Sequence, residues 1–231
     1  ISAPANIVAA ATPADGATAT FSATATDLVA GTVPVTASPT SGSTFALGTT
    51  TVGLTATPSR NNASSASFTV KVQDTTAPAI AASSNLTAEA TSAAGAVVTF
   101  PLPAATDAVS TPDVTAGPAS GSTFALGSTI VTVTARDAAN NTRTSTFTVT
   151  VKDTTAPALT LPAAQTLEAT SAAGATATFA ATATDAVSPV TLAYSAASGS
   201  TFALGTTSVS VTAKDAANNT ASGSFSILVR D

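Results

Sequence analysis

The residues best able to do chemistry in this chain of 231 residues are carboxylates that recur at a nearly fixed spacing. Three aspartates recur in this way, as the pairs Asp74 and Asp153, Asp107 and Asp185, and Asp137 and Asp215. Two asparagines, Asn140 and Asn218, follow the last pair, and Glu89 recurs as Glu168. Carboxylate and amide oxygens are the ligands that a hard cation such as Ca²⁺ prefers. The chain has no His and no Cys, so nucleophile–His catalysis and the soft ligands of zinc sites are excluded.

The acids belong to a tandem repeat. The phrase Ser-Gly-Ser-Thr-Phe-Ala-Leu-Gly occurs three times, at residues 41–48, 120–127 and 198–205. A strict long period indicates one small module copied in series rather than one large globule. We therefore predict modules at residues 1–73, 74–152 and 153–230, with Asp231 as the start of a next linker. Residues 74–79 have no counterpart before Ile1, so we expect the chain to be a window on a longer array.

Strand patterns dominate each repeat. In the second repeat, residues 96–102, 129–135 and 144–152 alternate apolar or β-branched residues with Thr, Ser or Arg, and no stretch has the period of a helix. About seven short strands per module predict an all-β fold of three tandem immunoglobulin-like antiparallel β-sandwiches forming an elongated rod. Each module contributes three core phenylalanines: Phe21, Phe45 and Phe68; Phe100, Phe124 and Phe147; and Phe179, Phe202 and Phe225. Leu126, Val131 and Val133 are expected beside them.

The charge and the apolar content of the chain argue against two classes of partner, nucleic acids and the membrane interior. The net charge is −5 and Lys plus Arg total 7, which argues against a nucleic-acid-binding surface. No apolar run approaches the roughly 18 residues that span a bilayer. The acids recur with the repeat, which favours a structural role over an enzyme.

Three motifs together resemble the hyalin repeat (HYR) domain, an immunoglobulin-like module, in its bacterial form. They are Asp-Thr-Thr-Ala-Pro at 74–78 and 153–157, the phrase Ser-Gly-Ser-Thr-Phe-Ala-Leu-Gly, and Asp-Ala-Ala-Asn-Asn at 137–141 and 215–219. The resemblance covers the whole chain. It implies an extracellular, non-enzymatic protein with adhesion or spacer roles.

The chain departs from the family pattern in two ways. Many members carry a Cys pair flanking the central motif, and the resemblance places those positions at Ala37 and Leu54, Ala116 and Val133, and Tyr194 and Val211. Packing must replace the bridge, whose loss costs about 2–4 kcal/mol per module. The first repeat is also degenerate, because Pro58 and Ala10 stand where the other repeats have Asp and Glu.

The expected strand order gathers the acids at module ends. Asp74, Asp107, Asp137 and Asn140 should meet at one end of the second repeat, and Glu89, Asp153, Asp185, Asp215 and Asn218 at the next junction. Calcium could clamp such junctions. Alternatively, the Asp and Asn side chains only cap turns, and the Glu meets a Lys or a backbone N–H. Since the first repeat lacks two of these acids, the junction between the first and second repeats should bind calcium more weakly.

The sequence favours a mechanical function: a spacer, stalk or fibre segment of a long extracellular or cell-surface adhesin-type protein. Pro78 and Pro157 restrict the linkers to extended conformations, which favours stiffness. One alternative is an adhesion module that binds host or matrix glycans or proteins. Its loops, however, are poor in aromatic and Arg anchors, with Tyr194 the exception. A third hypothesis is a self-assembling filament subunit, since edge strands and low charge invite self-association. The surest partners are neighbouring repeats of the same polypeptide.

Overall fold

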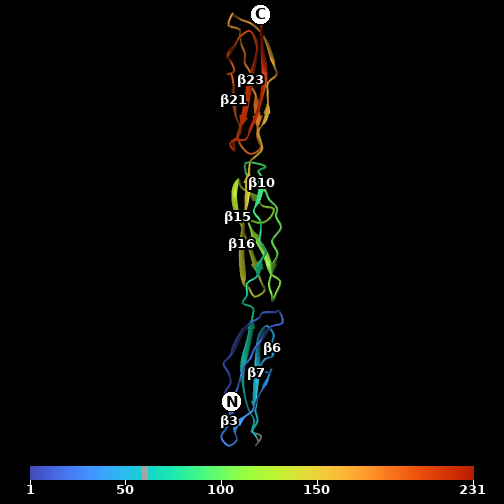
Figure 1. Cartoon of the computed structure of the whole chain (residues 1–231), viewed down its shortest axis with the longest axis vertical. Helices are drawn as coiled ribbons and strands as arrows, with labels where there is room; N and C mark the ends of the chain where they lie inside the picture. The colour runs from blue at the N-terminus through green and yellow to red at the C-terminus, as the bar shows by residue number, and fades with distance from the viewer. Residues whose placement is uncertain (59–61) are drawn as a thin grey trace. The chain divides into compact units, whose positions relative to one another are not determined.

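The computed structural model describes residues 1–58 and 62–231, and every regular element in them is a β-strand (Figure 1). The degenerate turn predicted at 57–62 therefore lies partly outside the described residues. In this described part, no helix has the length and apolarity needed to cross a membrane. The all-β, immunoglobulin-like sandwich class predicted from the sequence is confirmed.

Among the described residues each sequence repeat has eight strands, and their order is the same in the second and third repeats but differs in the first. Those of residues 1–73 are β1 Ile7–Ala10, β2 Ala17–Thr18, β3 Ala25–Asp27, β4 Gly31–Val33, β5 Val35–Ser38, β6 Thr44–Phe45, β7 Gly48–Ala56 and β8 Ser64–Gln73. Those of residues 74–152 are β9 Ala79–Ile80, β10 Leu86–Glu89, β11 Ala96–Val97, β12 Ala105–Thr106, β13 Asp113–Gly117, β14 Thr123–Phe124, β15 Gly127–Arg136 and β16 Thr142–Lys152. Those of residues 153–231 are β17 Ala158–Thr160, β18 Gln165–Glu168, β19 Ala175–Thr176, β20 Thr182–Thr184, β21 Thr191–Tyr194, β22 Thr201–Phe202, β23 Gly205–Lys214 and β24 Thr220–Arg230.

The chain divides into two compact units. The first comprises Ile1–Ser83, Pro101–Pro118 and Thr132–Thr146, and the second comprises Ser84–Phe100, Ala119–Val131 and Phe147–Asp231. The division passes through the second repeat, so each linker lies inside one unit together with the residues that contact it.

In the first unit, a four-stranded sheet has the order β1-β8-β7-β5, and β13 pairs antiparallel with β15. In the second unit, the corresponding sheet has the order β18-β24-β23-β21, and β10 pairs with β16. The edge pairings β1 with β8, β10 with β16 and β18 with β24 are parallel. The prediction of wholly antiparallel sandwiches is therefore wrong at this edge, where the first long strand of each repeat runs beside the last.

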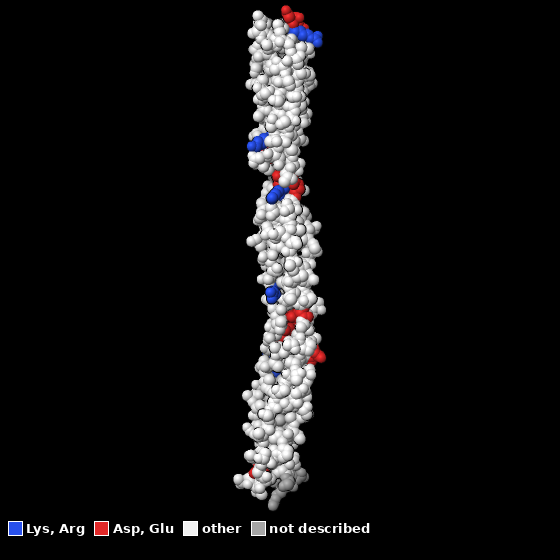
Figure 2. All heavy atoms as spheres, viewed as in Figure 1, with Lys and Arg blue, Asp and Glu red and all other residues white. Residues whose placement is uncertain are grey.

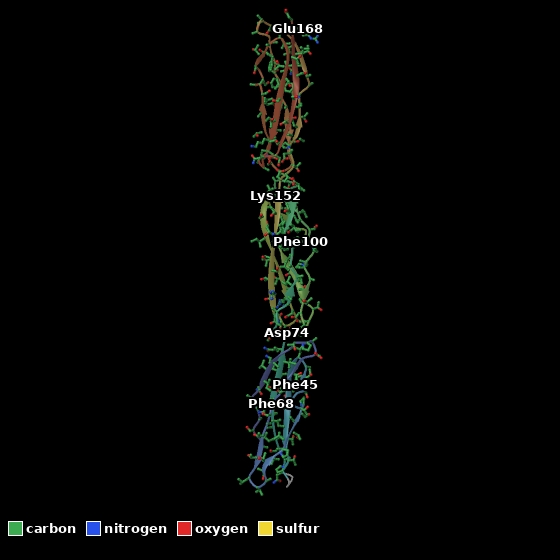
Figure 3. All side chains as sticks on the ribbon, viewed as in Figure 1. Phe45, Phe68, Asp74, Phe100, Lys152 and Glu168 are labelled. Carbon is green, nitrogen blue, oxygen red and sulfur yellow. The ribbon has the colours of Figure 1, made fainter. Side chains whose placement is uncertain are left out.

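Alternation decides which side chains are buried. In β24, Phe225, Ile227 and Val229 are buried and the residues between them are less so. Eight of the nine predicted core phenylalanines are buried, and Phe21 is half-buried against the first cluster. Figure 3 labels three of them, Phe45, Phe68 and Phe100. Leu126 is wrong as a core prediction, because its side chain is 46% exposed.

The first serine of the central phrase Ser-Gly-Ser-Thr-Phe-Ala-Leu-Gly hydrogen-bonds to the backbone of a core phenylalanine. Ser120 Oγ accepts a hydrogen bond from Phe100 N at 2.8 Å and donates one to Phe100 O at 2.8 Å. Ser198 Oγ likewise accepts from Phe179 N at 2.9 Å. Pro101 follows Phe100, and a proline cannot donate to a ladder. The serine thus replaces strand partners, which explains why the strand predicted at 96–102 shortens to β11.

The two positions of each absent Cys pair lie side by side on neighbouring strands of one sheet. The register pairs Ala37 with Leu54, Ala116 with Val133, and Tyr194 with Val211. Leu54, Val133 and Val211 are each at most 1% exposed. Apolar packing therefore occupies the place that a bridge would take.

Candidate metal sites

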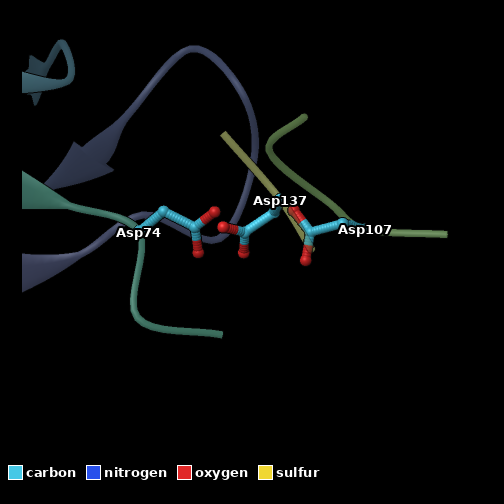
Figure 4. Close-up of side chains that lie close together, drawn as sticks. All are labelled: Asp74, Asp107 and Asp137. Carbon is cyan, nitrogen blue, oxygen red and sulfur yellow. The ribbon is translucent and has the colours of Figure 1, made fainter. Parts of the chain in front are cut away.

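Two aspartate trios are formed where strands end. Asp74 follows β8, Asp107 follows β12 and Asp137 follows β15. One carboxylate oxygen from each of the three lies within 4.8 Å of the others, and the three carboxylates face one another (Figure 4). We call this set the first trio. It brings together the three aspartates that the sequence placed at this end of the second repeat.

One oxygen of each aspartate caps a turn. Asp107 Oδ1 accepts hydrogen bonds from Val109 N at 2.8 Å and Ser110 N at 3.2 Å. Asp137 Oδ1 accepts from Asn141 N at 2.8 Å. Asp74 Oδ1 accepts from Thr76 N at 3.0 Å. The turn-cap interpretation therefore accounts for Oδ1 of each residue.

The second oxygens have a different environment. Asp137 Oδ2 accepts from Asn141 Nδ2 at 2.8 Å. Asp74 Oδ2 is buried and has no hydrogen-bond partner among the residues that the structure describes. Asp74 is 8% exposed and Asp137 is 5% exposed. A buried polar atom without a partner is costly and calls for a physical explanation.

Asn141, which follows the predicted Asn140, hydrogen-bonds within the first trio. Asn141 Nδ2 donates to Asp137 Oδ2 and, at 3.3 Å, to the carbonyl oxygen of Asp74, so it ties the hairpin to the linker. Asn140 adopts a φ of 72°, and its Oδ1 accepts a hydrogen bond from Arg136 Nη2. Asn218 likewise has a φ of 76°, which leaves Asn219 to contact the aspartates of the third repeat.

The second trio consists of Asp153, Asp185 and Asp215, whose ligand oxygens also lie within 4.8 Å of one another. Asp185 Oδ1 caps Val187 N and Ser188 N at 2.8 and 2.9 Å. Asp153 Oδ2 is again a buried oxygen without a hydrogen-bond partner in the described part of the chain. Burial raises the pKa of Asp153, and the charges of Asp185, Asp215 and Glu89 raise it further against a hydrogen bond from Thr155 N.

Glu89 lies at the second junction but is engaged by the linker. Thr154 Oγ1 and Thr154 N donate to its carboxylate at 2.6 and 2.7 Å, and Thr155 Oγ1 donates at 2.8 Å. These hydrogen bonds, from the Thr154 hydroxyl first, lower the pKa of Glu89. We call this contact the linker latch. Ala10 occupies the equivalent strand end in the first repeat, so that position offers no carboxylate to Thr75 and Thr76 of the first linker.

An open pocket borders each trio. The first, of about 570 Å³, is lined by Leu47, Asp74, Val109 and Asn141 among others. The second, of about 390 Å³, is lined by Leu126, Asp153 and Val187 among others. Val109 also packs against the hydrophobic cluster of the first repeat. Sequence reasoning missed this apolar contact, although the valine two residues after Asp107, repeated after Asp185, was a usable signal.

Charge is otherwise sparse, and most of the surface visible in Figure 2 is neither acidic nor basic. Strands of this length and pairing, repeated along the chain, define a tandem β-sandwich repeat protein. The HYR domain model matches residues 73–151 and 152–229, so the chain belongs to the HYR domain family.

A relative and several solved structures are similar to the chain. Hyalin from Strongylocentrotus purpuratus is 32% identical over 197 residues, which cover 80% of this chain and 16% of hyalin. The chain thus spans about a sixth of that protein's length. Mouse cadherin-23 EC22-24 is 15% identical, with a TM-score of 0.34 over 98% of this chain and 96% of that structure. Protocadherin gamma B2 extracellular cadherin domains 1-5 are 14% identical, with a TM-score of 0.34 over 100% of this chain and 60% of that structure. Scores this low carry no argument about function.

Proposed function

We propose that the chain is a spacer or stalk segment of a long extracellular adhesin-type repeat protein. In this proposal it consists of three HYR modules, at residues 1–73, 74–152 and 153–230, and Asp231 begins a further linker. The modules are of the kind found in secreted or surface-anchored bacterial proteins. Their role is mechanical: they hold other parts of the protein at a set distance.

The observation that carries the proposal is that each linker is hydrogen-bonded to folded residues beside it. Asn141 Nδ2 holds the carbonyl oxygen of Asp74, and Asn219 Nδ2 holds that of Asp153 at 3.2 Å. The Glu89 latch adds three hydrogen bonds to the second linker. A linker whose backbone and side chains are bonded in this way resists bending more than a free peptide, as a spacer requires.

The alternative of a glycan- or protein-binding module depended mainly on Tyr194 as an anchor residue. Tyr194, the lone aromatic residue assigned to a loop by sequence, lies in β21. Its hydroxyl accepts a hydrogen bond from Ala181 N at 2.9 Å, and its ring lies 5.7 Å from that of Phe179. Aromatic anchors of binding sites are presented to a partner. Tyr194 instead supports its own module.

The filament alternative rests on the sheet edges. In the first unit the sheet ends in β5, and in the second unit the corresponding sheet ends in β21. Edge strands can pair with another chain. Sedimentation velocity over a wide range of concentrations separates the hypotheses: a constant monomer supports the spacer, and reversible growth with concentration supports the filament.

Small-angle X-ray scattering tests the spacer proposal. Strand β16 has 11 residues, and at about 3.3 Å per residue it spans about 36 Å, so three modules end to end give a length of about 110 Å. A rod of that length has a radius of gyration of about 32 Å, whereas a compact globule of the same mass has one of about 17 Å. We expect the rod value, unchanged by dilution. The globule value would overturn the proposal.

A further inference from the structure

We propose that the first trio, Asp74, Asp107 and Asp137, is a calcium-binding site that joins the first linker to the second repeat. The proposal goes beyond the spacer role and does not depend on it. Every residue of the site lies in the first unit of the structure.

In each aspartate of the first trio one carboxylate oxygen caps a turn, so the other oxygen can serve as a ligand for a cation. Asp74, Asp107 and Asp137 each use Oδ1 to cap a turn, which fixes the direction of the other oxygen. Asp107 Oδ2 and Asp74 Oδ2 are not needed by those caps. The turn-cap and calcium interpretations are therefore compatible, because they call on different oxygens of the same side chains.

The buried oxygen of Asp74 is the independent sign of a missing ligand partner. Asp74 is more than nine-tenths buried, and its Oδ2 has no hydrogen-bond donor among the described residues. One oxygen of Asp74 lies within 4.8 Å of one oxygen each of Asp107 and Asp137, whose carboxylates face it (Figure 4). Burying like charges side by side is unfavourable unless a counter-charge compensates them. A cation placed among the three oxygens would satisfy Asp74 Oδ2 and remove the repulsion.

The dimensions fit calcium. Calcium–oxygen distances of about 2.3–2.6 Å allow two ligands of one ion to lie up to about 5 Å apart, whereas magnesium, at about 2.1 Å, allows about 4.2 Å. Oxygens that all lie within 4.8 Å of one another can share one calcium ion. The adjoining open pocket gives water access to complete the coordination shell. Three carboxylates with a partly open shell suit an affinity of about 10⁻⁴–10⁻³ M, as in extracellular calcium modules.

The test is a calorimetric titration of the full chain with calcium chloride after dialysis against chelator. The test variant is Asp107→Asn, because an asparagine keeps the Oδ1 acceptor for Val109 N and Ser110 N but loses the negative charge. The matched control is Asp113→Asn in β13, which makes the same charge change at an exposed position outside the trio. We expect Asp107→Asn to remove one equivalent of bound calcium and Asp113→Asn to remove none.

Two results would overturn the proposal. One is an absence of calcium binding to the unmodified chain at 10-fold above the expected Kd of about 10⁻³ M. The other is a calcium stoichiometry that is equal in Asp107→Asn and Asp113→Asn while circular dichroism shows both variants folded. If Asp107→Asn fails to fold, Asp74→Asn is measured instead and must lose the same equivalent.

Two further measurements distinguish calcium from magnesium and the calcium-site proposal from the spacer proposal. Magnesium chloride should give at least a 10-fold weaker apparent affinity, and equal affinities would refute the assignment to calcium. Scattering in calcium and in chelator tells the two proposals apart. A compact particle that still binds calcium would refute the spacer alone, and an extended particle without calcium binding would refute the metal site alone.

Discussion

Replacing Gly174 with alanine should lower the free energy of unfolding of the third repeat far more than the same change at Gly199. Gly174 has a φ of +111°, and an added Cβ would lie 1.8 Å from the carbonyl oxygen of Phe202. Gly199 also has a positive φ, +88°, but a Cβ there meets nothing within 4 Å in the described part of the chain. Both variants place an alanine at a positive φ, but only Gly174→Ala brings a Cβ against the Phe202 carbonyl oxygen. The difference between them therefore measures the effect of that close contact.

The magnitude follows from these distances. Alanine in a left-handed conformation costs about 1–2 kcal/mol, which is the cost expected at Gly199. At Gly174 the carbonyl oxygen must also retreat from 1.8 Å to at least 3.4 Å from the new Cβ before the contact is an ordinary one. That movement breaks the pairing of Ala175 with Phe202 and shifts a phenylalanine that is 5% exposed. Removing a buried phenylalanine costs about 3–5 kcal/mol, and displacing one costs only part of that. Together with the backbone cost of about 1–2 kcal/mol, we expect a total of about 3–5 kcal/mol for Gly174→Ala.

The chain supplies its own probe for this measurement. Tyr194 is the sole tyrosine of the sequence, there is no Trp, and Tyr194 packs on Phe179 in the third repeat. Tyrosine fluorescence during urea unfolding therefore follows this repeat. The midpoint should fall steeply for Gly174→Ala and slightly for Gly199→Ala. Equal free energies of unfolding for the two variants, within about 0.5 kcal/mol, would refute the argument from close approach.

Three further outcomes are expected. Ser198→Ala should destabilise the third repeat by about 1–3 kcal/mol in the same assay, because Phe179 N loses its acceptor; Ser208→Ala, at an exposed position of β23, is the control and should change little. Hydrogen bonds lower the pKa of Glu89 below its ordinary value of 4.5, so its stabilising effect is present above that value and is lost as pH falls through the lowered pKa. The difference in thermal midpoint between the unmodified chain and Glu89→Gln should therefore shrink as the buffer is taken from about pH 6 to about pH 3, and a difference that grows would contradict the latch. Ala10→Glu should slow amide exchange at Thr75, the counterpart of Thr154, by creating the missing latch on the first linker, and unchanged exchange there would show that the latch needs more than the glutamate.

The sequence predicted the ends at which the acids meet and the turn caps that the aspartates form, but not the other contacts of the acids. Repeat spacing and strand order place Asp74, Asp107 and Asp137 at one end, because each directly follows a strand. The asparagine was displaced by one residue, since Asn140 takes a left-handed conformation that only the backbone reveals. Glu89 reaches the next linker as predicted, yet its partners are threonine hydroxyls and a backbone N–H, which no spacing rule distinguishes from a lysine.

Leu126 illustrates a second limit of pattern reading. It shares the parity of the buried Phe124, so alternation predicts a core position. Strand β14 ends at Phe124 and β15 begins at Gly127, which has a φ of +100°. Alternation applies only within a continuous strand. The break between two strands turns Leu126 outward, where it lines the pocket beside Asp153.

The central octapeptide therefore links the interior of a repeat to the junction that follows it. In residues 120–127, Ser120 fixes the backbone of Phe100, Phe124 fills the core and Leu126 borders the second trio. A change at Leu126 need not disturb the core, because Leu126 lies between β14 and β15 and its side chain is 46% exposed. In the first repeat, Ala10 stands where the latch needs a glutamate, yet Ser41, Phe45 and Leu47 keep the same contacts to Phe21, the core and the first pocket. Under the spacer proposal, the stiffness of a linker can therefore differ between junctions without loss of the fold.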